Sequence, residues 1–551
     1  MTSQKESLQP EPTADSAIPR MTIVEWSALA AILLATAAIR IRLLDVPLDR
    51  DEGHYAYVAQ ALLDGLLPYE HAHTYFFPGI YLAFAAIFAT LGESIRSIHS
   101  TLLAMNLATL VVCYGLARRL FGPTTAIGTA AALALASLGR NANGFTANSE
   151  HFVLLAALTG LLGLVLAIET RRLWQLAVGA SLLGISITMK QHGVFFAAFG
   201  GLVILVDTWT RSDDSWAVRL RWIGVYAAGV AAPLIAMVLL LWQANILRSF
   251  WFWAIEFGVS YATRLSLRDG LSEFVSMGSW VFAPLAWLAP FALVGLAAQV
   301  SPRLRSRHSA LAFVFLVISF VAVCPGLYFR PHYWLLLFPA LALWVGIGLD
   351  CVARVLEGRL QVRALSHGAA ALTLLLAIAL SVHGQYRYYF VDTPERVSLK
   401  RYGVNPFVEA LEIGHFIERT TSPDDTVAVL GSEPEILFYA KRRSATGYLA
   451  TDLLTRSGEL AERMQANMIH EIESSSPEIL VVVAVGPSWN LSKQSSPLLR
   501  DWLRRNLDHR YERVAVVELN RPRRSRLLYG DSLPEPAQGS DWIVVARARG
   551  D

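Results

Sequence analysis

The sequence carries little charge for its length. Only 17% of its 551 residues are Asp, Glu, Lys or Arg, whereas 54% are hydrophobic, and the mean hydropathy is +0.42. A soluble protein of this size needs more charged side chains to cover its surface, so the excess apolar residues are expected to face lipid. The composition predicts a polytopic α-helical membrane protein, and a net charge of only +3 gives no indication of nucleic-acid binding.

Cysteine is also scarce. The three cysteines, Cys113, Cys324 and Cys351, are far apart and lie in or beside apolar segments. They form neither a disulfide framework nor a CxxC metal motif, and we interpret them as small core residues. The first apolar stretch lacks a small-residue cleavage site, so we interpret it as a retained membrane anchor rather than a signal peptide. Residues 1–21 before it are polar and are expected to form a disordered cytoplasmic tail.

About eleven apolar segments are long enough to cross the membrane as helices, which takes about 20 residues each. A further segment, 77–91, is shorter and begins with Pro78 and Gly79. We predict that it is a juxtamembrane helix rather than a span, because only then do the basic clusters fall on the same side of the membrane as the N-terminus. The predicted spans lie near residues 24–44, 98–117, 122–138, 151–169, 174–190, 192–208, 222–242, 276–298, 309–328, 333–350 and 366–385.

Clusters of basic residues decide the orientation. If 77–91 does not cross, five such clusters and the N-terminus all fall in the cytoplasm, as the positive-inside rule requires. This places the C-terminus outside. Arg40 and Arg42, at the outer end of the first span, count against this orientation, and we interpret them as snorkelling to the headgroups. The clusters are Arg118/Arg119, Arg171/Arg172, Arg211/Arg219/Arg221, Arg303/Arg305/Arg307 and Arg354/Arg359/Arg363.

The composition changes after the last span. Residues 407–420 have the spacing of an amphipathic helix, and four β-rich runs follow. We therefore predict a transmembrane domain over residues 22–390 and a soluble, extracytoplasmic α/β domain over residues 400–551. No motif in this second domain indicates a function. The β-rich runs are Thr426–Leu430, Ile479–Val485, Val514–Leu519 and Trp542–Ala546.

The predicted topology collects polar segments on the outer face. The first outer loop, 45–97, begins with Asp49-Arg50-Asp51-Glu52-Gly53-His54-Tyr55. The apolar spacing that follows predicts a helix with Asp51 and Glu52 in its first turn, where the helix dipole favours negative charge. An acidic pair there is also consistent with a plain helix cap. Two further polar segments, Lys190-Gln191 and Arg330-Pro331-His332-Tyr333, lie at outer helix ends; a snorkelling lysine and an aromatic belt are the alternative interpretations.

This pattern resembles the GT-C superfamily of glycosyltransferases, in particular the branch with protein O-mannosyltransferases, the lipid A aminoarabinose transferase and RgtA/B/C/D-like transferases. These proteins carry a DE-x-x-Y-A motif in the first outer loop, here Asp51–Ala56, and then a Pro-aromatic segment, here Phe76–Tyr81. Glu150 matches a second acidic position, usually Asp. The resemblance spans residues 22–390 and includes Lys190-Gln191 and Arg330–Tyr333. Where several relatives have Lys-Pro-Pro, this chain has Phe77-Pro78-Gly79.

The resemblance implies a GT-C-like fold and a membrane glycosyltransferase. Such an enzyme moves a sugar from a polyprenyl-phosphate donor to a glycan, lipid or protein acceptor at the outer face of the cytoplasmic membrane. The reaction needs a general base for the acceptor hydroxyl, positive charge for the leaving phosphate and an apolar groove for the prenyl chain.

The implied roles are assigned by position. We assign the base to Asp51, with Glu52 as the alternative and Asp49 as a weaker third candidate. The donor phosphate is assigned to Lys190, Arg330 and His332. The other residues expected at the substrate site are His54, Tyr55, Gln191 and Tyr333.

The metal requirement stays open. Glu150 could share a divalent cation with Asp51 or Glu52, and oxygen ligands of this kind suit Mg²⁺ or Mn²⁺. With His54 and His73 nearby in the sequence, Zn²⁺ is an alternative. Some branches of the superfamily work without metal, so the sequence assigns no definite cofactor.

Three other functions are compatible with the sequence. A transporter or flippase would tend to show internal repeats and charges at mid-bilayer, and no clear repeat is present. A polysaccharide polymerase or ligase would also act on lipid-linked sugars, but with basic outer-loop residues rather than an early acidic pair. A membrane scaffold with an outer sensing domain is the third. The sequence does not identify the sugar, the acceptor or the oligomeric state.

Overall fold

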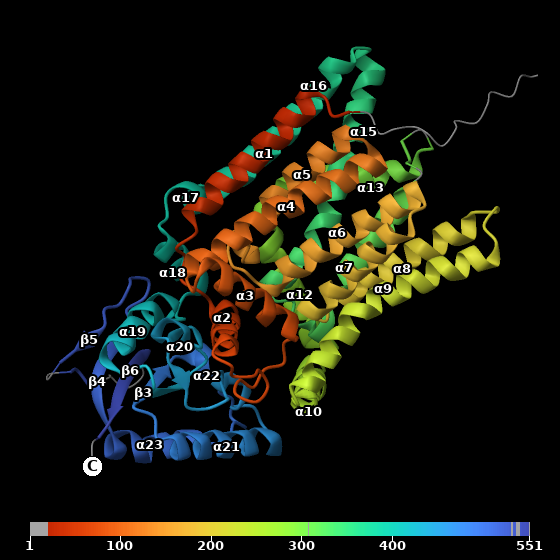
Figure 1. The fold of residues 1–551 in the computed structure, drawn as a ribbon. Coiled ribbons are helices and arrows are strands. Elements are labelled where there is room, and N and C mark those ends of the chain that lie inside the picture. Colours follow the sequence, from red (N-terminus) through yellow and green to blue (C-terminus); the bar gives the residue numbers. More distant parts are fainter. Residues whose placement is uncertain (1–19, 303, 307, 531–532, 536–539, 550–551) are drawn as a thin grey trace, which may run out of the picture.

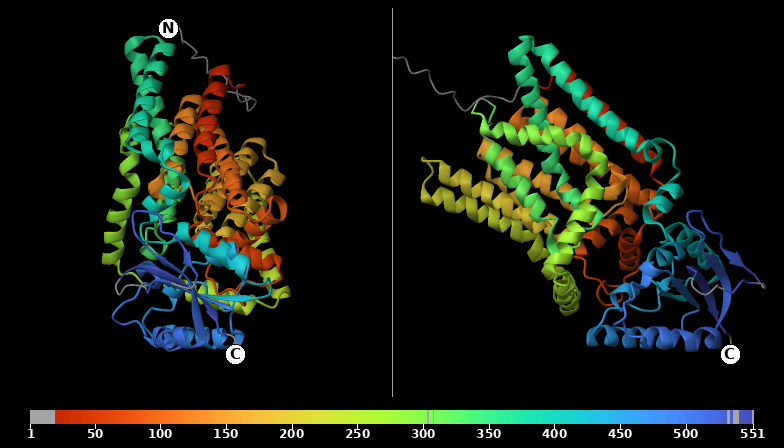
Figure 2. Two further views of the ribbon diagram at one scale, coloured as in Figure 1. Left: turned by 90° about the vertical axis from the view of Figure 1, so that its left-hand side faces the viewer. Right: turned by 180° about the vertical axis from the view of Figure 1, so that it is seen from behind.

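A computed structural model of the chain describes residues 20–302, 304–306, 308–530, 533–535 and 540–549. Most of the predicted N-terminal tail, residues 1–19, lies outside this part. Figure 1 shows a bundle of long helices with a domain of strands and shorter helices at one end. Figure 2 shows this domain below the bundle from two further sides. The predicted fold class, an α-helical membrane protein with a C-terminal strand-containing domain, is confirmed.

Helices of the bundle coincide with all eleven predicted spans. Among the described residues, eight helical stretches are long and apolar enough to cross a membrane, and α5, α7 and α14 are apolar but shorter. The number of spans therefore stays a prediction. The helices are α1 (Ile23–Arg42), α4 (Ile95–Phe121), α5 (Pro123–Ser137), α6 (Ser149–Thr170), α7 (Leu173–Met189), α8 (Gly193–Thr210), α9 (Trp216–Gln243), α12 (Leu267–Phe282) continued by η3 (Ala283–Leu288), α13 (Ala289–Ala297) and η4 (Ala298–Val300), α14 (Ser309–Val321), α15 (Phe338–Leu360) and α16 (Arg363–Gly384).

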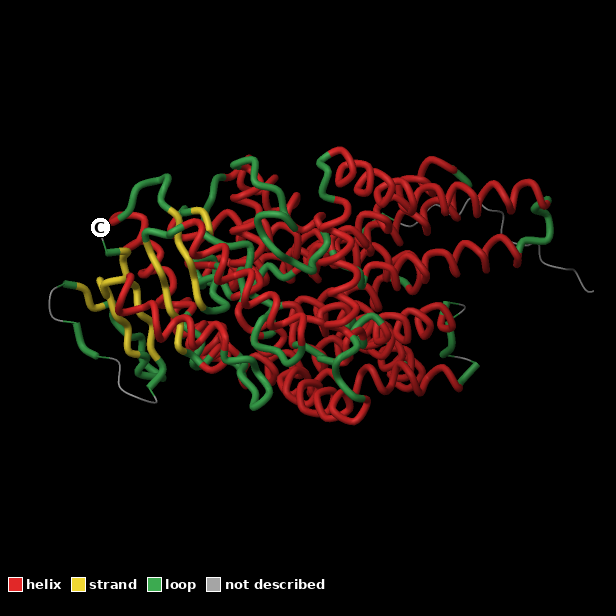
Figure 3. The backbone as a smooth tube through the Cα atoms, turned by 90° about the horizontal axis from the view of Figure 1, so that it is seen from below, coloured by secondary structure: helices red, strands yellow, loops and turns green. Residues whose placement is uncertain are grey.

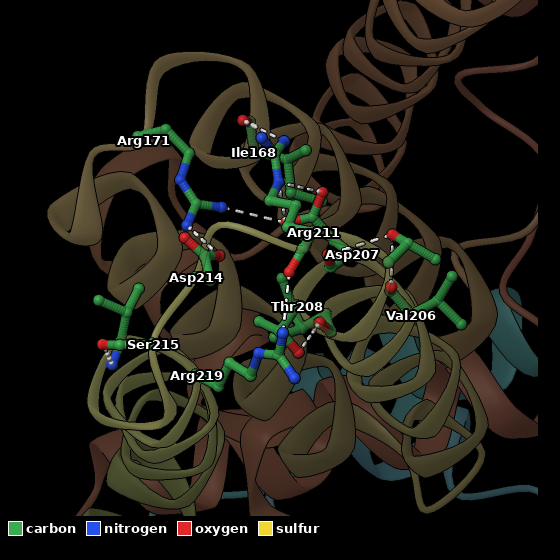
Figure 4. Close-up of polar contacts among 12 residues, drawn as sticks. Ile168, Arg171, Val206, Asp207, Thr208, Arg211, Asp214, Ser215 and Arg219 are labelled. Atoms are coloured by element: carbon green, nitrogen blue, oxygen red, sulfur yellow. Dashed lines mark hydrogen bonds and ion pairs between the residues drawn. The ribbon is translucent and has the colours of Figure 1, made fainter.

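The bundle end farthest from the strand-containing domain holds paired charges. There Arg171 contacts Asp207 at 3.1 Å and Asp214 at 2.7 Å, and Arg211 contacts Asp207 at 3.0 Å (Figure 4). These contacts join the ends of α6 and α8 to the start of α9. Two of the basic clusters predicted to be cytoplasmic thus lie at this far end.

Short helices fill the opposite end of the bundle. Helix α2 (Arg50–Leu63) and helix α3 (Pro78–Leu91) form the first loop. At 1.5 Å per residue the 14-residue α3 is about 21 Å long, less than the ~30 Å of hydrocarbon. The other short helical segments are η1 (Arg140–Ala142), α10 (Leu247–Phe250), a π-helical turn (Trp251–Phe257), α11 (Gly258–Ala262), η5 (Pro325–Leu327), η6 (Pro331–Leu336) and α17 (Tyr386–Phe390).

The C-terminal domain is built on one mixed sheet, with strand order β2-β1-β3-β6-β4-β5 in the described residues. Strand β1 pairs in parallel with β2 and β3, and β6 is antiparallel to β3 and β4. Figure 3 shows the strands gathered at one end of the molecule. All four predicted β-rich runs are strands and residues 407–420 are a helix. The elements are α18 (Pro394–Tyr402), α19 (Phe407–Thr420), β1 (Thr426–Leu430), α20 (Glu435–Ala440), β2 (Arg443–Ser444), η7 (Thr451–Leu453), α21 (Glu459–Ser475), β3 (Ile479–Ala484), α22 (Gly486–Trp489), α23 (Leu498–Arg510), β4 (Tyr511–Glu518), β5 (Leu528–Tyr529) and β6 (Trp542–Ala548).

The C-terminal domain packs directly on α2. Apolar residues of α2, α3, α20 and the sheet share one buried core. At Gly53 the two parts are so close that an added Cβ would lie 2.5 Å from the Cβ of Glu435. The backbone N–H of Leu48 donates to the hydroxyl of Tyr439 at 2.9 Å, and Arg50 pairs with Glu433 at 3.2 Å. The domain therefore fixes the position of the first loop.

The interpretation of Arg40 and Arg42 as snorkelling residues is wrong. Arg40 is buried, and its guanidinium donates to the carbonyl of Ser137 at 3.0 Å. Arg42 donates to the carbonyls of Tyr389 and Asp392. Both side chains are used to join the end of α1 to neighbouring segments of the protein.

Candidate active site

A polar cavity of about 250 Å³ lies where the bundle meets the C-terminal domain. Segments far apart in the sequence line it, from both sides of this junction. It contains Asp51, His54, Lys190, Arg330, His332 and Tyr333, all of which were predicted at the substrate site. Its lining residues are Asp49, Arg50, Asp51, His54, His73, Thr74, Tyr75, Phe76, Asn143, Lys190, Tyr261, Arg330, Pro331, His332, Tyr333, Arg401, Tyr402, Asn405, Phe407, Pro434, Ala450, Asp452 and Leu453.

Asp51 presents a carboxylate to this cavity. It lies in the first turn of α2, and its side chain is 31% exposed. Nε2 of His332 lies 3.7 Å from Oδ2 of Asp51, and this ring is charged only when it is protonated. Within the described ranges, no donor forms a hydrogen bond with this carboxylate. Its oxygens are therefore free to accept a proton from a bound molecule.

Glu52 points away from the cavity and is fully buried. Its Oε1 accepts hydrogen bonds from Nε2 of His99 at 2.9 Å and from the backbone N–H of Ala147 at 2.5 Å. Its Oε2 accepts from the backbone N–H of Asp49 at 3.4 Å. These contacts join α2 to α4 and to the segment before α6. The geometry thus favours Asp51 over Glu52 as a base and gives Glu52 a structural role.

Asp49 is the N-cap of α2 and also lines the cavity. Its Oδ1 accepts from the backbone N–H of Glu52 at 3.0 Å, and its Oδ2 accepts from the hydroxyl of Tyr402 at 2.6 Å. Burial raises the pKa of Asp49 to about 7, and the nearby negative charges of Glu52 and Asp51 add to this effect.

The two residues after the acidic pair have different surroundings. His54 lines the cavity, and its Nε2 lies 3.0 Å from Oγ1 of Thr74. Burial lowers the pKa of His54 to about 4, despite the nearby charge of Asp51, so this ring is neutral at pH 7. Tyr55 does not line the cavity; it is buried against Phe76 at a ring distance of 5.0 Å.

Lys190 is buried and contacts the carboxylate of Glu150, itself fully buried. Its ammonium also lies 4.3 Å from the ring centre of Tyr333. The alternative interpretation of Lys190 as a snorkelling lysine is therefore wrong. Gln191 is set back from the cavity, where its side chain donates to the carbonyl of Tyr75 at 3.3 Å.

His332 joins the acidic residues to this pair. Its Nε2 lies 3.7 Å from Asp51 and 4.0 Å from Oε1 of Glu150. Burial lowers the pKa of His332, against the opposing effect of the two carboxylates. A series of neighbouring ionisable groups thus runs from Asp51 through His332 and the buried Glu150 to Lys190, and all but Glu150 line the cavity.

Arg330 is the N-cap of η6 and lines the cavity. Its guanidinium lies 5.4 Å from the ring centre of Tyr328, and Tyr261 lines the same cavity. In the part of the chain that the structure describes, no carboxylate lies within 4.0 Å of it. Its charge is therefore open to an anion in the cavity.

The donor set does not fit a resident metal ion. Across the described residues, no three His, Cys, Asp or Glu side chains are grouped to hold one. Glu150 already contacts Lys190. His73 stacks on Trp253 at 4.5 Å and pairs with Glu471 at 3.7 Å. We therefore derive no step of the chemistry through a metal.

An apolar groove of about 710 Å³ runs along the bundle beside the cavity. It is lined by residues of α5, α12, η3, α13, α14 and α15, and by Trp334 and Leu337. The same short helix η6 contributes to both spaces, since His332 and Tyr333 line the polar cavity and Trp334 lines the groove. A molecule with a polar head and a long apolar chain could occupy both.

Sequence reasoning missed the cavity residues that the C-terminal part supplies. Arg401, Tyr402 and Asn405 come from the end of α18 and the turn after it, and Asp452 comes from η7. No motif marks these residues. They reach the cavity only because the domain packs on α2, a contact that no local pattern in the sequence indicates.

Comparisons with known proteins agree with this architecture. The family model described as dolichyl-phosphate-mannose-protein mannosyltransferase matches residues 77–242. No curated protein matches the chain. Among solved structures, apo ArnT from Cupriavidus metallidurans is similar at 14% identity and a TM-score of 0.60, covering 95% of this chain and 98% of ArnT.

Two ligand-bound structures have the same fold. ArnT from Cupriavidus metallidurans bound to undecaprenyl phosphate matches with a TM-score of 0.59 and 16% identity, over 86% of this chain and 96% of that chain. The archaeal oligosaccharyltransferase AglB from Archaeoglobus fulgidus, in complex with an inhibitory peptide and a dolichol-phosphate, matches with a TM-score of 0.54 and 10% identity, over 94% and 75%. The resemblance expected from the sequence is confirmed at the level of the fold, and with its candidate spans the chain is an integral membrane protein.

Proposed function

On the premise that this chain has the GT-C fold of membrane glycosyltransferases, we propose that it transfers a sugar from a polyprenyl-phosphate donor to an acceptor hydroxyl. One observation carries the proposal. The free carboxylate of Asp51 and the guanidinium of Arg330, which has no carboxylate partner among the described residues, line one cavity. The apolar groove begins at η6, the short helix that follows Arg330. The lipid phosphates bound to ArnT and AglB support a ligand of this class.

The two chemical parts of the donor, its prenyl chain and its phosphate, fit two different spaces. The prenyl chain lies in the groove lined by α12, α13 and α15, where burial of apolar surface holds it. The phosphate lies at the polar end, against Arg330 and Lys190. Positive charge there stabilises the negative charge that develops on the leaving phosphate as the bond to the sugar breaks.

Transfer then needs one displacement. The acceptor hydroxyl oxygen forms a bond to the anomeric carbon, and the bond from that carbon to the phosphate oxygen breaks with its electron pair. The hydroxyl proton passes to Oδ of Asp51. Nε2 of His332 lies 3.7 Å from Oδ2 of Asp51, beyond hydrogen-bond distance, so the carboxylate stays free to take this proton. A single displacement inverts the anomeric configuration.

We further propose that the cavity opens to the outer face of the cytoplasmic membrane. The basic clusters around Arg171 and Arg211 lie at the opposite end of the bundle, and the positive-inside rule assigns that end to the cytoplasm. A cysteine placed at exposed Asp64 of α2 should then react with a membrane-impermeant thiol reagent in intact cells. Reaction only after the membrane is opened would reverse the orientation.

The test of the function is release of polyprenyl phosphate from a labelled lipid-linked sugar. Asp51→Asn should lower the rate at least about 100-fold, the order of magnitude that a positioned base contributes. Asp64→Asn is the matched control, because Asp64 is an exposed residue at the far end of the same helix. Near-wild-type release by the Asp51 variant refutes the assignment. Transport of an intact lipid-linked glycan without release would favour a flippase.

A further inference from the structure

Arg401 is held at the cavity wall by the segment that joins the bundle to the C-terminal sheet. Its guanidinium carbon lies 4.6 Å from the ring centre of Trp280 and 5.2 Å from that of Tyr402. Its Nε donates to the side-chain oxygen of Asn143, which has a left-handed backbone with φ of 54°. Rings and amide together fix the plane of the guanidinium and leave its two terminal nitrogens without a hydrogen bond to the described residues.

The charges around the cavity are unevenly matched. Four arginine or lysine side chains line it. Arg50 pairs with Glu433 at 3.2 Å, and Lys190 pairs with Glu150. Arg330 and Arg401 have no carboxylate within 4.0 Å in the described ranges of the chain. Arg401 is half-buried, whereas Arg330 is exposed. A guanidinium that has lost part of its hydration gains most from a bound anion, so this argument applies most strongly to Arg401, and Arg330 offers a second unpaired positive charge.

The two unpaired guanidinium groups belong to different walls. Arg330 lies with Tyr261 and Tyr328, at the start of η6, where the apolar groove also begins. Arg401 is adjacent in sequence to Tyr402, whose hydroxyl is bonded to Asp49. Asp49 is two residues before Asp51. Arg401 therefore lies on the wall that holds the start of α2, while Asp51 also faces His332 of η6 at 3.7 Å.

We propose that Arg401 is an anion subsite for the acceptor, and that the acceptor carries a carboxylate or phosphoryl group close to the hydroxyl that receives the sugar. The planar guanidinium makes two parallel hydrogen bonds to such a group. The assignment of this anion to the acceptor rests on the proposed function, whereas binding of an anion at Arg401 can be measured without turnover.

The test uses the purified full chain in lipid nanodiscs and four probes. Glucose 6-phosphate and glucuronate report on the anion subsite, glucose is the neutral control, and undecaprenyl phosphate reports on the donor end. We expect the wild type to bind an acidic sugar at least tenfold more tightly than glucose. Arg401→Gln should erase this preference and change undecaprenyl phosphate affinity less than twofold. Arg330→Gln should keep the preference for the acidic sugar and weaken undecaprenyl phosphate binding.

Two further variants control for loss of structure. Arg401→Lys keeps the charge and should retain part of the preference. Arg219→Gln should leave both affinities unchanged, because Arg219 also stacks on a tryptophan, Trp216 at 5.7 Å, but lies at the opposite end of the bundle.

Several outcomes overturn the inference. If Arg401→Gln weakens the binding of undecaprenyl phosphate tenfold, Arg401 binds the donor phosphate instead. If the wild type binds the acidic sugars no better than glucose, there is no acceptor anion subsite. Two other results would contradict the proposed function rather than the anion subsite. In the first, the wild type does not bind undecaprenyl phosphate; in the second, Asp51→Asn still releases polyprenyl phosphate.

Discussion

The hydroxyl of Tyr402 donates a 2.6 Å hydrogen bond to Oδ2 of Asp49, a residue 353 positions earlier in the chain. The backbone N–H of the preceding residue, Leu48, donates to the hydroxyl of Tyr439 at 2.9 Å. Two tyrosines of the C-terminal part thus hold consecutive residues at the start of α2. Of these two bonds, only the one from Tyr402 reaches an ionisable side chain.

Removing the Tyr402 hydroxyl should raise the pKa of Asp49 further above 7, because the bond stabilises the charged form. A carboxyl with a raised pKa in the folded state keeps a proton that the unfolded chain loses above about pH 3.9. Its stabilising contribution therefore falls as the pH rises through this window and levels off above the folded pKa. In Tyr402→Phe the pH at which the melting temperature levels off should move upward.

Tyr439→Phe is the matched control for this measurement. It removes a hydroxyl from the same contact but leaves Asp49 bonded, so the levelling-off point should stay where it is in the wild type. An upward move in both variants would show that the docking contact, and not the Asp49 carboxyl, is responsible. The charged and titratable groups that face Asp49 are Asp51, Glu52, Arg401, Tyr402, Glu435 and Tyr439.

Glu52→Gln should destabilise the protein, whereas Asp51→Asn should not. The buried Glu52 carboxylate satisfies His99 and the N–H of Ala147, and weakening these bonds costs about 1–3 kcal/mol. Asp51 makes no such bond, and its replacement should change the free energy of unfolding by less than about 0.5 kcal/mol. Thermal unfolding of both variants in detergent measures this, and equal losses would contradict the separation of roles.

Lys190→Met should leave the buried carboxylate of Glu150 without a counter-ion and cost about 3–5 kcal/mol. The double variant Lys190→Met/Glu150→Gln removes both charges and should recover most of the stability. Undecaprenyl phosphate affinity should not recover with it, because the proposed phosphate contact is still missing. Recovery of both would assign Lys190 a structural role alone.

Filling the apolar groove should block the donor without disturbing the core. Ala286 is exposed and lines the groove, whereas Ala283 is exposed on the same short helix η3 and does not. Ala286→Trp should weaken undecaprenyl phosphate binding at least tenfold, and Ala283→Trp should leave it unchanged. Fluorescence titration with the lipid compares the two, and equal affinities would place the prenyl chain elsewhere.

The sequence predicted the elements well because their signals are local. Apolar runs located the bundle helices, and β-rich runs located strands β1, β3, β4 and β6. The alternation of basic clusters indicated that Asp51, Lys190 and Arg330 belong to one end of the molecule, and all three line one cavity.

Local signals could not separate Asp51 from Glu52. Adjacent helical residues point about 100° apart, so which one faces the cavity depends on what packs against α2. That partner is α20, close to Gly53. The contacts of Tyr402 with Asp49 and of Arg50 with Glu433 join residues more than 350 positions apart, and no periodicity records such pairs.

Because the wall that contains Arg401, Tyr402 and Asp452 is encoded after the bundle helices, it is synthesised last. A nascent chain whose bundle helices are already in the bilayer still has an incomplete cavity, because Arg50 lacks its counter-ion Glu433 and Asp49 lacks the hydroxyl of Tyr402. The cavity is therefore complete only after the C-terminal domain has docked on α2.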